Sequence, residues 1–147
     1  HAARRRYRYL LRASPAPADS FWDAYAWRCA SAPLDVGAMC AAAEALRGDV
    51  RLGAFVKRER HRHLRAGAGE APEVPAYETH VSDVCVYAAE SLPGVVVVEL
   101  EASRFFYSTV RLLVWELARV GRGQSSAADF AALVAAGAAG RAEGTSA

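Results

Sequence analysis

The sequence has few of the residues on which disulfide, metal and redox chemistry depend. Its three cysteines are Cys29, Cys40 and Cys85, and no two of them form a CxxC pair. The odd number and wide spacing indicate neither a disulfide framework nor a cysteine zinc site. Such usage is typical of an intracellular, reducing compartment, whether cytoplasm, nucleus or organelle matrix.

Other common catalytic patterns are absent as well. The close histidine pair, His61 and His63, would point in opposite directions on a strand and diverge on a helix, which disfavours a metal site. The sequence contains no GxSxG, P-loop or GxGxxG motif, so the common hydrolase and nucleotide-binding signatures are excluded. The sequence therefore shows no sign of a metal site.

Long apolar segments are missing too. No run of 18 apolar residues is free of charge, which predicts that no segment spans a membrane. The sequence begins with histidine and has no signal-peptide pattern, so we expect a piece of a longer protein. With 147 residues, 53% of them hydrophobic, the chain is long enough for one globular core and too short for two.

Positive charge is concentrated in two short segments, although the formal net charge is only +2. Five arginines fall within residues 1–12, and residues 57–65 contain another five lysines and arginines. Two such clusters indicate a basic surface that faces phosphates. The alternative is that both runs are simply solvated.

The hydrophobic pattern predicts an α+β domain with a mixed or antiparallel sheet covered by helices. Residues 3–12 alternate as a strand, which places Arg6 and Arg8 on one face and Tyr7 on the other. Four consecutive valines open a strand at 95–101, and such a run indicates a central strand covered on both faces. We further expect a strand at 79–88, helices at 36–47, 103–121 and 126–136, a basic loop at 58–77 and a disordered tail at 137–147.

Capping residues mark the ends of the predicted helices. Asp35 is a favourable N-cap for the first helix, and Gly48 follows its last turn. Ser103 is the expected N-cap of the long second helix. Ser126 and Asp129 have the spacing of a capping box, with aspartate in the acidic position, before the third helix.

One arginine of the long helix demands an explanation. Arg111 lies in the middle of an apolar run of phenylalanine, valine and leucine, on a helix side shared with Arg104 and Tyr107. A buried, unpaired arginine is strongly destabilising, so we expect a buried carboxylate beside it. Only Glu116 and Asp83 offer one in this chain, which suggests that the partner lies elsewhere. The alternative is that Arg111 lies at a helix edge and reaches solvent.

Four segments resemble motifs of the TruA-type tRNA pseudouridine synthases, in the order of that family. The strand ARRRYRYLL resembles its ARRYRYxI strand. The segment LDVGAMCAAAEALRGDVRLGAF resembles LDxxxMxxAAxxLxGxHDFxxF, and VELEASRFFYSTVRLLVWELARVGRG resembles xIxANxFLYxMVRxLVGxLxxVGxG. The segment SAADFAALV matches the helix that follows. Together the segments cover nearly the whole chain.

The resemblance implies an α+β catalytic domain that isomerises uridine to pseudouridine in the anticodon stem-loop of tRNA, without metal or cofactor. Tyr7 would stack on the flipped base, and Arg111 would pair with the catalytic aspartate and keep it ionised. Tyr107 and Arg104 would face the substrate cleft. Phosphates of the RNA backbone would be contacted by Arg6, Arg8, Arg58, Arg60 and Arg62.

The chain also departs from the family pattern. The GRTDxGVHA motif, which carries the nucleophilic aspartate, and the final APxxGLxLxxVxY strand are both absent. Thr109 replaces the usual methionine and Trp115 the usual glycine. We therefore expect residues 1–136 to be the C-terminal half of the catalytic domain, inactive by itself. The resemblance leaves a homodimer of the full-length protein open. The rival interpretation is a non-catalytic RNA-binding or ribosome-associated module that retains the fold.

Overall fold

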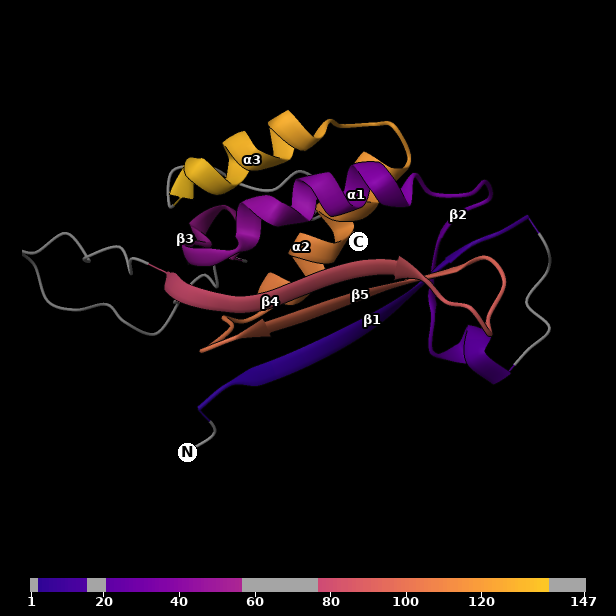
Figure 1. Cartoon of the computed structure of the whole chain (residues 1–147), viewed down its shortest axis with the longest axis horizontal. Helices are drawn as coiled ribbons and strands as arrows, with labels where there is room; N and C mark the ends of the chain where they lie inside the picture. The colour runs from indigo at the N-terminus through magenta and orange to yellow at the C-terminus, as the bar shows by residue number, and fades with distance from the viewer. Residues whose placement is uncertain (1–2, 16–20, 57–76, 138–147) are drawn as a thin grey trace, which may run out of the picture.

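A computed structural model describes residues 3–15, 21–56 and 77–137 of the chain. Within them, a five-stranded mixed sheet has the order β2-β1-β5-β4-β3. Its three α-helices all lie on one side of the sheet (Figure 1). The α+β prediction is therefore confirmed. The strands are β1 (Arg5–Ala13), β2 (Trp27–Ala30), β3 (Gly48–Arg51), β4 (Glu78–Ala88) and β5 (Val95–Ala102), and the helices are α1 (Val36–Ala43), α2 (Thr109–Gly121) and α3 (Ala127–Ala135).

The valine-rich strand β5 is the central strand, as predicted. It pairs antiparallel with β1 on one side and with β4 on the other. Val96 and Val98 belong to the core beneath the helices. Val95 and Val97 point to the opposite face and are buried there as well. The helices thus cover one face of β5, and its first residues are buried on the other face as well.

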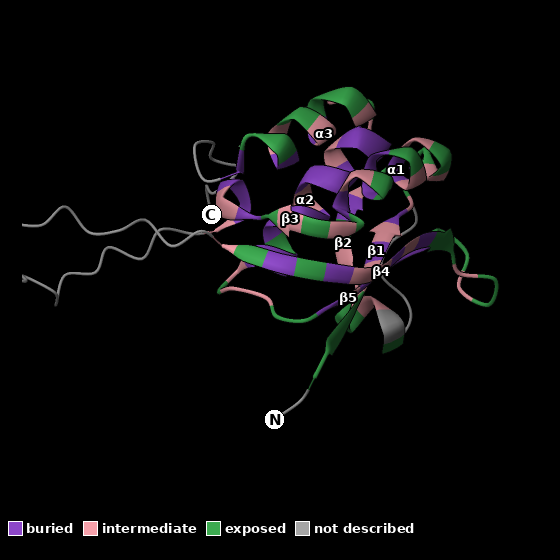
Figure 2. Ribbon diagram, turned by 60° about the vertical axis from the view of Figure 1, so that its left-hand side comes forward, coloured by how far each residue is buried: buried purple, intermediate pink, exposed green. Residues whose placement is uncertain are grey.

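The predicted alternation of β1 is confirmed by its register with β5. Tyr7 is paired with Leu100, whose side chain is in the core, so Tyr7 projects on the side of the helices. Arg6 and Arg8 are paired with residues of the outer face and project away from the helices. Residues 5–8 are exposed, and Figure 2 shows this end of β1 in green.

The predicted first helix is confirmed in position and in its N-cap. The Asp35 carboxylate accepts a hydrogen bond of 2.9 Å from the Ala38 backbone N–H. The side chains of Met39 and Leu46 are fully buried. The last turn is a 3-10 helix, Glu44–Leu46, and Gly48 follows it with a φ of +87°, which favours glycine.

The long second helix begins later than predicted, at Thr109 instead of Ser103. The Ser103 hydroxyl accepts a hydrogen bond from the His80 N–H, and the Ser103 N–H donates to the His80 carbonyl. Because these contacts extend the β4–β5 ladder, Ser103 cannot cap a helix. Residues 103–108 form a loop, which ends at Ser108 with a left-handed φ of 61°.

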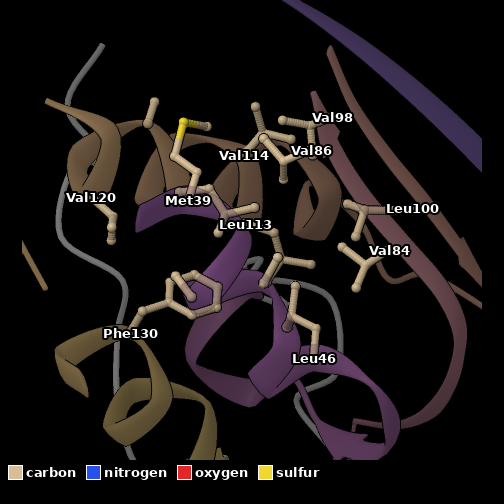
Figure 3. Close-up of a cluster of buried hydrophobic side chains, with 14 of the residues drawn as sticks. Met39, Leu46, Val84, Val86, Val98, Leu100, Leu113, Val114, Val120 and Phe130 are labelled. Carbon is tan, nitrogen blue, oxygen red and sulfur yellow. The ribbon is translucent and has the colours of Figure 1, made fainter. Parts of the chain in front are cut away.

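The core lies between the sheet and the helix layer. Figure 3 shows Leu113 and Val114 of α2 between the sheet side chains of β4 and β5 and Phe130 of α3, which lies on the far side of the core. The helices α1 and α2 approach closely at Gly121, where a Cβ atom would lie 2.6 Å from the Met39 sulfur. The predicted capping box of α3 is present, with Ser126 and Asp129 each accepting from the other's backbone N–H. The predicted basic loop and C-terminal tail fall almost entirely outside the described residues.

Candidate functional site

The loop of residues 103–108 connects β5 to α2 and is tied to the start of β4. Thr79, only 6% exposed, provides the anchor. Its hydroxyl donates to the Arg104 carbonyl at 2.7 Å and accepts from the Arg104 N–H at 3.3 Å. These bonds hold the loop backbone against the sheet, so the side chains that the loop carries have a defined position.

Tyr7, the predicted base-stacking residue, lies beside this loop. Its side chain is 42% exposed. Phe105 of the loop meets it edge to face, with ring centroids 5.3 Å apart and an interplanar angle of 88°. Tyr7 is therefore an accessible aromatic ring whose orientation is supported by a second ring.

Arg111 lies on the same side of the sheet, because it belongs to α2. It is exposed, and the expectation of a buried arginine in mid-helix is wrong. The later helix start places Arg111 in the first turn of α2, and Arg111 is exposed because it lies with Trp115 and Arg119 on the stripe of α2 that is not buried. Its two candidate partners are engaged elsewhere: Glu116 pairs with Arg119 and Asp83 with Arg6 and Arg47.

The surroundings of Arg111 favour an anion. No hydrogen bond or ion pair joins Arg111 to any residue that the structure describes. The first turn of α2 has no acidic residue, and the positive end of its helix dipole lies there. A guanidinium added to this end makes a local positive charge that a carboxylate or a phosphate would neutralise.

Arg104 and Tyr107 belong to the loop and not to the helix, so the predicted helix face with Arg111 does not exist. Tyr107 is 68% exposed. The Arg104 guanidinium lies 5.0 Å from the centroid of the Phe106 ring, and its Nε donates to the Glu78 carbonyl at 3.0 Å. Both predicted substrate-facing residues are thus at the end of the sheet where Tyr7 lies, on a different element from the one expected.

Arg6 and Arg8 lie on the opposite face of the sheet, where carboxylates surround them. Glu99, only 8% exposed, accepts a hydrogen bond from Arg8, and the Arg6 guanidinium lies 3.4 Å from Asp83. The hydrogen bond and the charge of Glu99 raise the pKa of Arg8. The predicted contacts of Arg6 and Arg8 with RNA phosphates would have to compete with these ion pairs. Arg58, Arg60 and Arg62 lie outside the described residues.

Tyr87 also belongs to this outer face. Its hydroxyl donates to Glu99 at 3.2 Å. Burial and the neighbouring Glu99 carboxylate raise the pKa of Tyr87. Glu99 therefore accepts from both adjacent strands, which ties β1 and β4 to the central strand by side chains as well as by backbone.

A polar hollow of about 540 Å³ is lined by the end of β3, the start of β4 and the first residues of the loop, Ser103 and Arg104. Its lining includes Arg51, Glu78, Ser103 and Arg104. Sequence reasoning missed this hollow, and it also missed the ring contact of Phe106 with Tyr77, whose centroids are 5.1 Å apart. The available signal was the run of three aromatic residues, 105–107, shortly after the predicted strand at 95–101.

The described part of the chain contains neither a cluster of metal-ligating side chains nor a helix of membrane-spanning character. Within 3–15, 21–56 and 77–137, no three histidine, cysteine, aspartate or glutamate side chains come together as a metal site. None of the helices in this part of the chain has the length and apolar character that a membrane span requires.

The outer edge of β1 is only partly covered. The register of β1 with β2 begins at Leu11 and ends at Ala13. Within the described part of the chain, residues 5–10 of β1 have no strand partner on that side. This unpaired edge begins at the exposed end of β1, beside Tyr7, and offers backbone donors and acceptors to another extended segment.

Comparison with known sequences finds relatives of this chain, although no family model matches it. A tRNA pseudouridine synthase A from Nostoc sp. is 36% identical over 132 residues, which are 90% of this chain and 41% of that protein. The enzymes of the same name from Thermosynechococcus vestitus and Synechococcus sp. are also 36% identical, over 86% and 88% of this chain.

The matched region accounts for only part of these relatives. The chain spans about two fifths of their length, since the matches cover 38–41% of the three proteins. Over most of its own length, this chain is thus homologous to one part of the tRNA pseudouridine synthase A sequences, as its ordered motifs indicated.

Proposed function

We propose that this chain supplies one side of a uridine-isomerising site that acts on tRNA. In this proposal Tyr7 stacks on the uracil that is flipped out of the RNA, and Arg111 binds the carboxylate of the nucleophilic aspartate. That aspartate belongs to a segment outside this chain. The relatives, which are tRNA pseudouridine synthases A, support the reaction and the substrate class.

The proposal rests on the exposure of Arg111 and on its lack of a carboxylate partner among the described residues. Arg111 is an exposed cation in the first turn of α2, without a carboxylate partner among the described residues, whereas Arg6 and Arg8 both have one. An opposite charge within about 4–6 Å favours the ionised form of a carboxyl group and lowers its pKa. Arg111 and the α2 N-terminus would keep an incoming aspartate ionised, as a nucleophile requires.

The proposed reaction moves a bond without a change in composition. The bond between the uracil nitrogen N1 and the ribose is broken, and a bond from the uracil carbon C5 to the ribose replaces it. The proton at C5 is released, and N1 gains one. Between the two bonds the detached uracil must be held while it rotates, and the supported ring of Tyr7 would provide a stacking surface for it.

The test uses the intact protein that contains this chain. Arg111→Ala should abolish pseudouridine formation in a tRNA transcript and leave the affinity for that tRNA within about threefold, because the lost contact is to the aspartate and not to RNA. Arg28→Ala, which removes an exposed arginine of β2, is the matched control and should keep the activity. The measurements are tritium release from uridine labelled at C5 and equilibrium binding.

Two outcomes would contradict the proposal. If Arg111→Ala loses tRNA affinity while each bound tRNA is converted at the original rate, Arg111 contacts the RNA and does not position the nucleophile. If the unaltered intact protein binds tRNA and forms no pseudouridine, the rival interpretation as a non-catalytic RNA-binding module is supported.

A further inference from the structure

Three side chains beside the polar hollow form an ordered stack. The ring of Tyr77 meets the ring of Phe106 at an interplanar angle of 89°, with centroids 5.1 Å apart. The guanidinium of Arg104 lies over the Phe106 ring at 5.0 Å from its centroid. An edge-to-face contact thus joins Tyr77 to Phe106, and a cation–π contact joins Phe106 to the Arg104 guanidinium.

The guanidinium of Arg104 is fixed in more than one direction. Its Nε donates to the Glu78 carbonyl at 3.0 Å, and its backbone is held by the two bonds to Thr79. Arg104 is nevertheless an exposed residue. The guanidinium is thus held over Phe106 while Arg104 as a whole stays exposed, so a planar group in a fixed position is accessible to a ligand.

The charge around the hollow favours a neutral, flat ligand over a bare anion. Among the residues that the structure describes, the lining has two arginines, Arg51 and Arg104, and two carboxylates, Asp49 and Glu78. Arg51 is already paired with Glu78, at 3.0 Å. A nucleobase suits such a lining, because it combines a flat face for stacking with both donors and acceptors at its edges. The volume of about 540 Å³ is within the range of small-molecule sites.

We infer that the hollow binds an unpaired nucleotide of the RNA substrate other than the target uridine, with its base stacked on the open face of Arg104. This inference rests on the proposed function. Phe105 supports Tyr7 on one side of the loop, and Phe106 supports Arg104 on the other. The loop of residues 103–108 would thus carry support for two stacking surfaces, the Tyr7 ring for the target base and the Arg104 guanidinium for a second base of the same strand.

The test combines RNA lacking single bases with variants of the stack. In the intact protein, anticodon stem-loop RNAs with one abasic nucleotide at each loop position in turn are compared for binding. Removal of one base other than the target should weaken binding by roughly 5- to 150-fold, the range measured for a stacked base. Arg104→Lys keeps the charge and loses the plane, so it should weaken binding of the complete RNA similarly.

Binding of the Arg104→Lys variant to the abasic RNA separates loss of base stacking from a general structural defect. Arg104→Lys should have no further effect on the RNA that lacks the recognised base, whereas a general structural defect would weaken every RNA equally. Phe106→Leu should behave as Arg104→Lys does, since it removes the ring beneath the guanidinium. Phe21→Leu is the control, because Phe21 is an exposed aromatic residue that belongs to neither the loop nor the lining of the hollow.

Several results would overturn the inference. If Arg104→Lys binds the complete RNA as tightly as the unaltered protein, the site recognises charge alone and holds no stacked base. If every abasic RNA loses the same affinity, no single base is recognised, and the inference is also overturned. In both cases pseudouridine formation can persist, so the proposed function survives. Failure of the unaltered protein to bind any RNA would overturn both.

Discussion

The rings of Tyr7 and Phe105 meet edge to face, 5.3 Å apart, and join the exposed end of β1 to the loop before α2. The two residues are distant in sequence, and their contact depends on the β1–β5 pairing that aligns Tyr7 with Leu100. Phe105 is only partly buried, yet it packs against the core. Phe105 therefore packs between the core and the Tyr7 ring and restricts the motion of that ring.

Removal of this support should slow catalysis more than it weakens binding. Aromatic pairs of this geometry contribute about 0.5–1.5 kcal/mol, so Phe105→Leu should reduce the rate of pseudouridine formation about two- to tenfold. The affinity for tRNA should change less, because Tyr7 itself remains. Single-turnover rates and equilibrium binding of the intact protein would measure both effects.

The control for this variant is Tyr7→Phe, which keeps the ring and its contact with Phe105. It should retain most of the rate if Tyr7 acts by stacking. A Phe105→Leu protein with an unchanged rate would show that the orientation of Tyr7 does not depend on this contact.

The close approach of α1 and α2 should make Gly121 intolerant of a side chain. A Cβ at this position would lie 2.6 Å from the sulfur and 3.0 Å from the Cγ of Met39, which is fully buried. Gly121→Ala should therefore lower the free energy of unfolding by about 1–3 kcal/mol. Urea unfolding followed by circular dichroism would measure the change.

A matched substitution lies on α1 itself. At Gly37 a Cβ would meet only an oxygen of Asp35, at the ordinary distance of 3.5 Å. Gly37→Ala should be neutral or stabilising, by up to about 1 kcal/mol, because alanine favours the helix. Equal destabilisation by both substitutions would refute the explanation by close packing.

The capping box of α3 should make stability depend on pH in the acidic range. Hydrogen bonds from the Ser126 hydroxyl and backbone lower the pKa of Asp129 below its ordinary value of 3.8. Because the pKa is lowered in the folded state, the contribution is present above pH 3.8 and is lost as the pH falls through the folded value. Asp129→Asn should therefore reduce the acid-induced drop in melting temperature.

The N-cap itself gives a second, pH-independent test. Ser126→Ala should lower stability by about 0.5–2 kcal/mol at neutral pH, since it removes the acceptor for the Asp129 N–H. If Asp129→Asn keeps the full acid sensitivity of the unaltered chain, carboxylates elsewhere determine it.

The predicted phosphate contacts should differ between the two basic clusters. In a plot of log tRNA affinity against log salt concentration, replacement of Arg58, Arg60 and Arg62 by glutamine should reduce the magnitude of the slope by about two to three. Replacement of Arg6 and Arg8 should have a smaller effect per residue, because Asp83 and Glu99 already neutralise them. Binding of the intact protein measured over a range of salt concentrations would distinguish the two. An unchanged slope in the triple variant would refute the prediction for the second cluster.

Several elements were determined by local sequence alone. The alternation in β1, the valines of β5, the Asp35 N-cap and the Ser126 capping box were all predicted correctly. Each depends on residues that are at most a few positions apart, and the hydrophobic period or the cap is sufficient to specify it. The ordered motifs likewise identified the relatives without any knowledge of the fold.

The tertiary structure alone decided where α2 begins. Ser103 has the chemistry of an N-cap, and the sequence offers no reason to reject it. Its hydroxyl instead binds the His80 backbone, 23 residues earlier in the chain, so the helix starts at Thr109. That shift places Arg111 in an exposed first turn, and it places Arg104 and Tyr107 on a loop. The position of the site residues therefore depends on a competition for the Ser103 hydroxyl between a local helix N–H and the His80 N–H, which only the folded sheet brings to it.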